Sequence, residues 1–452
     1  MLDMYKFGTV EFSPVKPYDI VIVGGGAAGI GAAIGARQAA QDATILIIES
    51  ESCLGGAATH RGVCAFCGLF TVDEKPRQAV GRIWQELRQR LRALNGTTES
   101  PVRIRGVFQV VDPEALKLVL DDLMKDYNID VLLHTTVVGA TRSESNTIVS
   151  IDIQEKRGRS RVSAYAFVDC SGDCDLAYLA GASTRYGNHG TLNLGSLSVR
   201  FSGIDQNARP SISTWRDAII AAKQKAPELS QILPKNGSAL LHMPVSRDVI
   251  AFLPSAYYDT RSSASITAAE QSGRRQAQEY LRILRTLPGH EDMYVVSTGP
   301  NFGCRESRHM NSMYQLTEED IMSDRRFSDV IAIGAWGFEF HDVEHENWES
   351  TFTYPPKGRF EIPLASLRSI DTPNLFAAGR CIDADQKASS AVRVMGTALA
   401  TGQAAGVAAG LESMRGSKDL WDVTQVQDCL RAHGAFLDSA SLPEGGPIEQ
   451  IH

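Results

Sequence analysis

The sequence has no apolar run long enough to cross a membrane as a helix, which requires about 20 consecutive apolar residues. Segment 1–16 has no apolar core of signal-peptide type, so we expect a cytoplasmic protein. Lysine and arginine do not cluster, and the formal net charge is -8. We therefore expect neither a nucleic acid nor a membrane as a partner, because both are held through clustered basic side chains.

Cysteine is sparse, with eight in 452 residues, and only Cys64/Cys67 and Cys170/Cys174 are close in sequence. Neither pair comes with the second pair of cysteines or histidines that a zinc site needs, so we predict no metal. In a reducing compartment these cysteines remain thiols. The Cys64-Ala-Phe-Cys67 motif leaves two interpretations open: a redox-active dithiol beside a cofactor, or two small thiols that line a pocket without a catalytic role.

The segment Asp19–Glu49 has the order of one βαβ unit. An apolar run at 20–23 is followed by a glycine turn, an alanine-rich helix, and a second apolar run at 45–48 that ends in an acid. A glycine motif alone is weak, because the chain has 39 glycines. The strand, helix, second strand and acid at their proper spacing together predict a bound dinucleotide.

Each glycine of this turn has a physical role. Gly24 permits the tight turn out of the strand, Gly26 lets a pyrophosphate approach the backbone, and Gly29 lets the helix pack closely on the strand. The free N–H groups and dipole of the helix then face the phosphates. Glu49 is placed to accept hydrogen bonds from a ribose diol.

Periodicity outside this unit is also informative. Asp112 and Pro113 are a cap and a first-turn proline, the usual start of a helix. The predicted elements are a helix at 114–127, a hairpin of 147–153 with 161–167, and amphipathic helices at 215–225 and 266–287.

Three segments carry a resemblance to a known family. They are the βαβ unit with the glycine-rich segment Glu51–Phe70 after it, the strand and turn of Val168–Ala182, and the strand, loop and helix of Asn374–Gly410. In this order they resemble the FAD-dependent oxidoreductases of the glutathione-reductase-like superfamily. A G-G-x-x-T segment at 55–59 and an R-E-S-R segment at 305–308 are similar to those of one of its families of small-molecule oxidoreductases.

The resemblance implies an α/β fold, in which a Rossmann-like FAD-binding domain with a parallel sheet carries an inserted α+β substrate or cap domain. The FAD-binding domain would comprise residues 1–184, including a hairpin at 145–167, and residues 329–452. The cap domain would comprise residues 185–328.

The resemblance also implies FAD as the cofactor and, by matching positions, a set of residues around it. These are Gly24, Gly26, Ala28, Gly29, Glu49, Ser50, Gly55, Gly56, Thr59, Val138, Ser171, Gly172, Gly379, Asp383, Asp385, Val394, Met395 and Thr397. His60, Cys64 and Cys67 are candidate points of covalent attachment.

No second dinucleotide-binding pattern occurs in residues 135–300, where a nicotinamide domain would lie. We therefore expect electrons to come from the substrate by hydride transfer to the flavin and to leave to oxygen or another acceptor. The substrate is expected to be a small polar, oxygen-rich molecule such as a sugar, a polyol or a specialised metabolite. The alternatives are a thiol/disulfide-active flavoprotein that uses Cys64 and Cys67, and a non-catalytic FAD-binding redox sensor.

His341 is the predicted general base, because it follows an apolar strand at 330–333 and imidazole titrates near neutral pH. The alternative is a surface histidine in an acidic loop with Asp342 and Glu344, which would raise its pKa. The residues predicted to orient the substrate are Arg305, Arg308 and Arg393. For Arg305 and Arg308, a buried ion network is an equally open interpretation.

Overall fold

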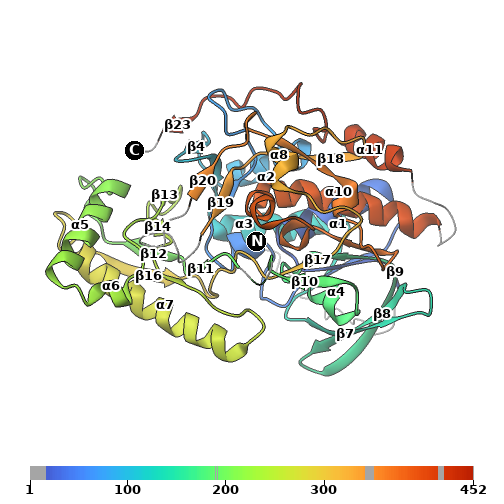
Figure 1. Ribbon diagram of the computed structural model, residues 1–452, viewed down its shortest axis with the longest axis horizontal. Coiled ribbons are helices and arrows are strands. Elements are labelled where there is room, and N and C mark those ends of the chain that lie inside the picture. The colour runs from blue at the N-terminus through green and yellow to red at the C-terminus, as the bar shows by residue number, and fades with distance from the viewer. Residues whose placement is uncertain (1–16, 189, 191, 342–350, 416–421, 451–452) are drawn as a thin grey trace, which may run out of the picture.

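A seven-stranded sheet carries the larger lobe of the molecule (Figure 1). The computed structural model describes residues 17–188, 190, 192–341, 351–415 and 422–450. The strands are β1 (Tyr18–Val23), β2 (Ile45–Ile48), β6 (Asp130–Leu132), β7 (Thr136–Arg142), β8 (Ile148–Glu155), β9 (Gly158–Asp169) and β22 (Leu375–Ala377). Strands β6, β2, β1, the end of β9 and β22 are parallel, and the start of β9 pairs antiparallel with β8, which pairs antiparallel with β7.

The parallel strands are buried on both faces, which explains their uninterrupted apolar runs. Ile20 and Ile45 point to a core shared with the helices, whereas Val21 and Leu46 point to a second core under the β7–β9 meander. On the helical face lie α1 (Ala27–Ala39), α2 (Arg82–Ala93), α3 (Pro113–Asp126), α10 (Met395–Arg415) and α11 (Val423–Ala432). The predicted α/β architecture with a Rossmann-like parallel sheet is confirmed.

Helices α1 and α10 lie side by side, and their small residues permit this contact (Figure 1). A Cβ on Gly31 would stand 2.2 Å from the carbonyl oxygen of Leu399, and a Cβ on Gly402 would stand 2.0 Å from that of Ala28. At the contacts between α1 and α10, residue numbers increase in the same direction along both helices, so the two helices run parallel. Both N-termini therefore point to the end of the sheet where βαβ folds bind nucleotides.

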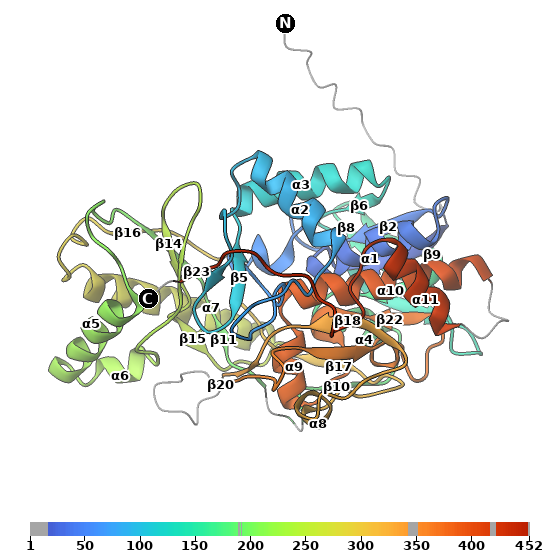
Figure 2. The same ribbon diagram turned by 90° about the horizontal axis from the view of Figure 1, so that it is seen from above.

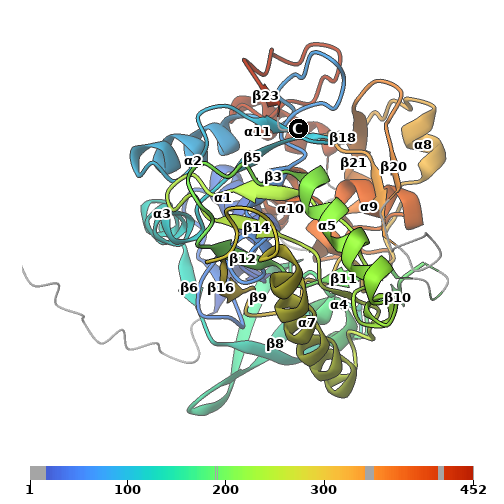
Figure 3. The same cartoon turned by 90° about the vertical axis from the view of Figure 1, so that its left-hand side faces the viewer.

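The smaller lobe has its own sheet and core, and Figures 2 and 3 show its helices on one side of the central sheet. Its antiparallel sheet has the order β13 (Leu240–His242), β14 (Val249–Ala251), β12 (Val199–Ser202) and β16 (Tyr294–Thr298). Its helices are α5 (Ile212–Lys225), α6 (Leu229–Ile232) and α7 (Ser263–Leu284). The two amphipathic helices predicted here exist, displaced at their ends by about one turn or less.

Shorter elements connect the lobes. A four-stranded sheet has the order β23 (Glu449–Gln450), β4 (Val102–Arg103), β5 (Val107–Val110) and β3 (Ala65–Cys67). Two-stranded pairs are β10 (Thr184–Tyr186) with β17 (Arg308–Met310), β11 (Gly195–Ser196) with β15 (Ser255–Ala256), β18 (Val330–Gly334) with β21 (Phe360–Pro363), and β19 (Phe338–Phe340) with β20 (Thr351–Thr353). The short helices are α4 (Asp175–Leu179), α8 (Glu318–Met322) and α9 (Gln386–Val392).

The apolar strand predicted before His341 is present as β18. Among the described residues β18 pairs with β21, in a two-stranded sheet separate from the parallel sheet. A further strand, β19, separates β18 from His341. Among the described residues no single helix is long and apolar enough to span a membrane, and α9 and α10 pass such a test only together, across a bend of 92°.

Candidate functional site

The glycine turn between β1 and α1 is built as its spacing predicts. Gly24 has φ +100°, and a Cβ there would stand 2.3 Å from the carbonyl oxygen of Cys170. A Cβ on Gly29 would stand 1.8 Å from the carbonyl oxygen of Gly24. Gly26 differs, because a Cβ on it would meet only the Cα of Gly56, at 3.8 Å. Gly24 and Gly29 are thus required by the protein itself, whereas Gly26 faces space that a phosphate group fits.

The N-terminus of α1 has the features of an anion-binding site. Gly26 is its N-cap, no side chain caps it, and no acidic residue lies in its first turn. Buried Glu49 accepts hydrogen bonds from the N–H groups of Gly25 at 2.7 Å and Glu51 at 2.9 Å, and from the hydroxyl of Ser50 at 3.2 Å. These bonds fix the carboxylate beside the turn, while a carboxylate has about four acceptor positions and so keeps capacity for a ribose hydroxyl.

The glycine-rich segment after β2 closes over this turn. Gly56 approaches Gly26 so closely that a Cβ on Gly56 would stand 2.9 Å from the Cα of Gly26. The hydroxyl of Thr59 donates to the carbonyl oxygen of Leu54 at 2.8 Å, so Thr59 holds the loop shape. Val138 lies where the register of β7 and β8 shifts, between Val137 and Gly139, and this irregularity suits a backbone that must contact a base.

The turn after β9 is held by a buried aspartate. Asp169 accepts from both the N–H and the hydroxyl of Ser171, at 3.1 and 2.7 Å. Gly172 has φ +83°, and a Cβ there would stand 2.5 Å from the guanidinium of Arg380. Arg380 in turn forms an ion pair with Asp173 at 3.2 Å. These contacts join the second and third predicted cofactor segments.

The two aspartates predicted to meet the cofactor already have partners within the protein. Asp383 forms an ion pair of 2.7 Å with Arg185 and accepts from the N–H of Ser312. Asp385 is the N-cap of α9 and also accepts from the N–H of Glu318. These bonds favour a structural role for both aspartates, which the sequence motif alone did not indicate. Gly379, with φ +68°, keeps the position predicted for it at the end of β22.

Four charged or titratable side chains from three distant segments meet near the start of α10. The Nε2 atom of His341 lies 3.6 Å from the carboxylate of Glu339, and that carboxylate lies 3.9 Å from the guanidinium of Arg393. Arg393 also donates to the backbone carbonyl of Glu339 at 3.1 Å. Arg305 donates to the carbonyl oxygen of Leu194 and is close enough for its charge to act on both His341 and Arg393.

The electrostatics of this cluster set the protonation of His341. Burial and then the charge of Arg305 lower the pKa of His341 well below 6.5, and the opposing hydrogen bond to Glu339 does not compensate. Burial alone would raise the pKa of Glu339, but the hydrogen bond from His341 and the charges around it, Arg393 and Arg305 included, hold it below its ordinary value. At neutral pH the cluster therefore contains a neutral imidazole and a carboxylate.

Three polar atoms here are buried without a hydrogen-bond partner: Nδ1 of His341, Nε of Arg393 and Oγ1 of Thr397. Thr397 lies in the first turn of α10, and Arg393 lies in the bend just before it. Buried polar groups are normally satisfied, so two such atoms at this bend and a third on His341 indicate a place for a polar ligand. Glu339 was missed as a partner of His341, although two residues of an extended segment share one face and could have signalled the contact.

Arg308, the third arginine predicted to orient the substrate, does not join this cluster. It pairs with Asp175 at 3.2 Å and stacks over the ring of Tyr178 at 4.2 Å. These contacts favour the alternative of an ion network for Arg308, and a substrate contact for it stays a prediction. The interpretation of His341 as a surface histidine was wrong, because its side chain is 9% exposed. Asp342, Glu344 and His345 lie outside the described residues.

Two other histidines, His309 and His60, have contacts outside this cluster. His309 is buried between Glu306, at 3.2 Å, and the carbonyl oxygen of Ile382, at 3.0 Å. His60 contacts the thiol of Cys53 at 3.2 Å and lies 3.7 Å from Glu51. Both ring nitrogens of His309 are therefore occupied by contacts within the protein.

Cys64 and Cys67 are both free thiols. Cys64 is fully buried and donates to the carbonyl oxygen of Ala58 at 3.7 Å. Burial raises the pKa of Cys64 to about 12, and burial also raises that of Cys67. A thiol that remains protonated is a poor nucleophile, so this environment disfavours thiol–disulfide exchange.

We expect the double substitution Cys64→Ser with Cys67→Ser to leave the rate of flavin reduction by substrate within about tenfold of the unmodified protein. Serine keeps a hydrogen-bond donor of similar size at both positions. Anaerobic stopped-flow absorbance measures the rate, and FAD content serves as the control for folding. A loss of about a thousandfold with FAD still bound would restore the disulfide mechanism.

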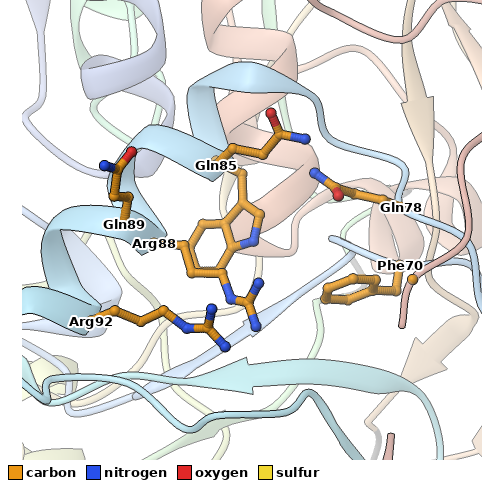
Figure 4. Close-up of a pocket in the computed structure, with 8 residues that line it drawn as sticks. Phe70, Gln78, Gln85, Arg88, Gln89 and Arg92 are labelled. Carbon is orange, nitrogen blue, oxygen red and sulfur yellow. The ribbon is translucent and has the colours of Figure 1, made fainter. Parts of the chain in front are cut away.

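A cavity of about 200 Å³ lies against α2, away from the cluster of His341, Glu339, Arg393 and Arg305 (Figure 4). Its walls are Phe70, Gln78, Trp84, Gln85, Arg88, Gln89, Arg92 and Gly445. None of the predicted site residues lines it. Among the described residues, no group of three or more histidine, cysteine or acidic side chains is placed to hold a metal ion.

Comparison with known proteins identifies a family for this chain. The sequence profile of a family described as FAD dependent oxidoreductase matches residues 19–430. No curated protein sequence matches the chain. 

Similar solved structures include a geranylgeranyl bacteriochlorophyll reductase-like protein from Thermoplasma acidophilum, with 13% identity over 92% of this chain and 83% of that one and a TM-score of 0.47. A flavin-dependent brominase, solved as a triple mutant, has 14% identity over 92% of this chain and 84% of that one, with a TM-score of 0.45. Similarities of this size concern the fold and not the substrate.

Proposed function

Because the chain belongs to the family of FAD-dependent oxidoreductases and so has FAD as its cofactor, we propose that it dehydrogenates a small polar metabolite, with His341 as the general base. The observation that carries this proposal is the state of His341. Its imidazole is buried, its Nδ1 atom has no partner, and Glu339 lies 3.6 Å from its Nε2 atom. Burial and the charge of Arg305 lower its pKa, which favours the neutral imidazole that can take a proton from a hydroxyl or amine.

The contacts of each residue indicate its role in the proposed reaction. Glu339 faces Nε2 of His341, which favours the tautomer with the proton on Nε2 and leaves Nδ1 as the acceptor. Nδ1 takes the proton of the substrate hydroxyl or amine, and Arg305 and Arg393 hold the substrate in place. Bound FAD supplies an acceptor for the two electrons that leave as hydride, and oxygen or another acceptor reoxidises it.

A substrate screen under anaerobic conditions tests this proposal. Candidate alcohols, amines and dithiols are mixed with the yellow protein, and loss of the flavin absorbance identifies those that reduce it. Peroxide release on admitting air then tells whether oxygen is the acceptor. Bleaching by dithiols alone would replace the dehydrogenase with the thiol-active function, and bleaching by no substrate class would leave the redox sensor.

The pH dependence of flavin reduction should reflect the lowered pKa of His341. The base must be neutral to act, and its pKa lies well below 6.5 because of burial and the charge of Arg305. We therefore expect the rate with an alcohol substrate to stay constant as the pH falls through about 6.5 and to decline only well below it. Single-turnover rates between about pH 5 and 8 check this, and a decline centred near 6.5 would contradict a buried, neutral base.

A further inference from the structure

Arg305 and Arg393 are the starting point, because both are shielded from water with little opposing charge. The side chain of Arg393 is 14% exposed, and within the described part of the chain its ion pair is with Glu339, at the long distance of 3.9 Å. Arg305 has no ion pair among the described residues and donates to the backbone carbonyl of Leu194. Neither guanidinium group therefore has a close carboxylate partner among these residues.

This arrangement disfavours the charged forms of both arginines. Burial and the neighbouring charge of Arg393 lower the pKa of Arg305 to about 10, and burial also lowers that of Arg393. Both side chains nevertheless remain charged at neutral pH. Buried charges are normally paired, so an anion is the group that this environment lacks.

The buried polar atoms without hydrogen-bond partners also favour an anionic ligand. The Nε–H of Arg393 is a donor only, and it is buried without an acceptor. The hydroxyl of Thr397, four residues later in the first turn of α10, is a second buried donor without a partner. A ligand that satisfies them must present acceptor oxygens, and the neutral His341 adds no positive charge that would favour a dianion.

We propose that the substrate carries a carboxylate, which Arg305 and Arg393 bind next to His341. This inference rests on the proposed function for the location of the substrate. A carboxylate matches the planar fork of arginine and supplies the acceptor oxygen that Nε of Arg393 lacks. The substrate class narrows from polar metabolites in general to hydroxy or amino acids and related carboxylates.

Binding to the oxidised holoprotein tests this without turnover. Acetate, butanoate, phenylacetate and benzoate, which have no hydroxyl or amine to oxidise, are titrated anaerobically, each beside its neutral primary amide, and shifts of the flavin absorbance give Kd. We expect at least one acid to bind about tenfold or more tightly than its amide. Arg393→Gln and Arg305→Gln should each remove this preference, while Arg393→Lys keeps the charge and should retain part of it.

Arg161→Gln is the matched control, because Arg161 is exposed and pairs with Asp152 on the meander. It should leave the preference for acids intact. FAD content and the melting temperature show which variants are folded. Equal affinities for every acid and amide, or an acid preference that persists in folded Arg305→Gln and Arg393→Gln proteins, would overturn the carboxylate site.

Failure of the proposed function is distinguishable from failure of this inference. His341→Gln should still prefer acids to amides, because the arginines are unchanged, although its flavin is reduced much more slowly. A His341→Gln protein that is reduced normally and still prefers acids would refute the base and leave the carboxylate site standing. Loss of the preference only in the arginine variants supports the carboxylate site directly.

Discussion

The Gly26→Val protein should fold but contain less than about a tenth of the usual FAD. A Cβ at this position meets only the Cα of Gly56, at 3.8 Å, so the protein itself tolerates a side chain there. Gly26 is the N-cap of α1, with φ -74° and ψ -172°, which a valine adopts without strain. The valine methyl groups would instead occupy the space that the pyrophosphate needs. Flavin absorbance of the purified protein and a thermal melt measure the two effects separately.

Gly29→Val is the matched control for this result. Its Cβ would stand 1.8 Å from the carbonyl oxygen of Gly24, so the substitution should disrupt the packing of α1 and the fold together. Gly26→Ala, with one methyl group, should lose less cofactor than Gly26→Val. If Gly26→Val retains full FAD content, the cofactor does not cross this turn and the dinucleotide assignment fails.

The His341→Gln protein should bind FAD normally yet show flavin reduction slower by a factor of about 10² to 10⁴. Glutamine has similar size but cannot accept the proton at neutral pH. The backbone at this position is anchored independently of the side chain: the N–H donates to Asn193 and the carbonyl oxygen accepts from Leu194. The effect should therefore be on rate rather than folding. Anaerobic stopped-flow reduction of the flavin measures it.

Two comparisons sharpen this experiment. The deficit of His341→Gln should shrink at high pH if ionisation of the substrate replaces the base. His60→Gln serves as the control, because His60 lies beside Cys53 and Glu51 rather than in the cluster. A fully active His341→Gln protein together with an inactive His60→Gln protein would transfer the role of base to His60.

The sequence by itself determined the nucleotide-binding half of the fold, because its signals are local. A βαβ unit is specified by spacings of about thirty residues, and uninterrupted apolar runs indicate strands covered on both faces. The cap on α3 was likewise legible, since Asp112 bonds the N–H groups of Glu114 and Ala115 a few positions away. Gly24 and Gly29 do what the motif requires, because each is constrained by backbone close to the turn.

The candidate site was decided by tertiary structure, since its members come from segments that approach only when the whole chain folds. Arg305 and Arg308 are three positions apart, yet Arg305 donates to Leu194, which itself bonds the backbone of His341, whereas Arg308 pairs with Asp175. Asp383 matched a cofactor motif, but long-range packing gives it Arg185 as a partner. Sequence supplies the residue types of such a site, whereas burial, which sets the protonation of His341, exists only in the folded chain.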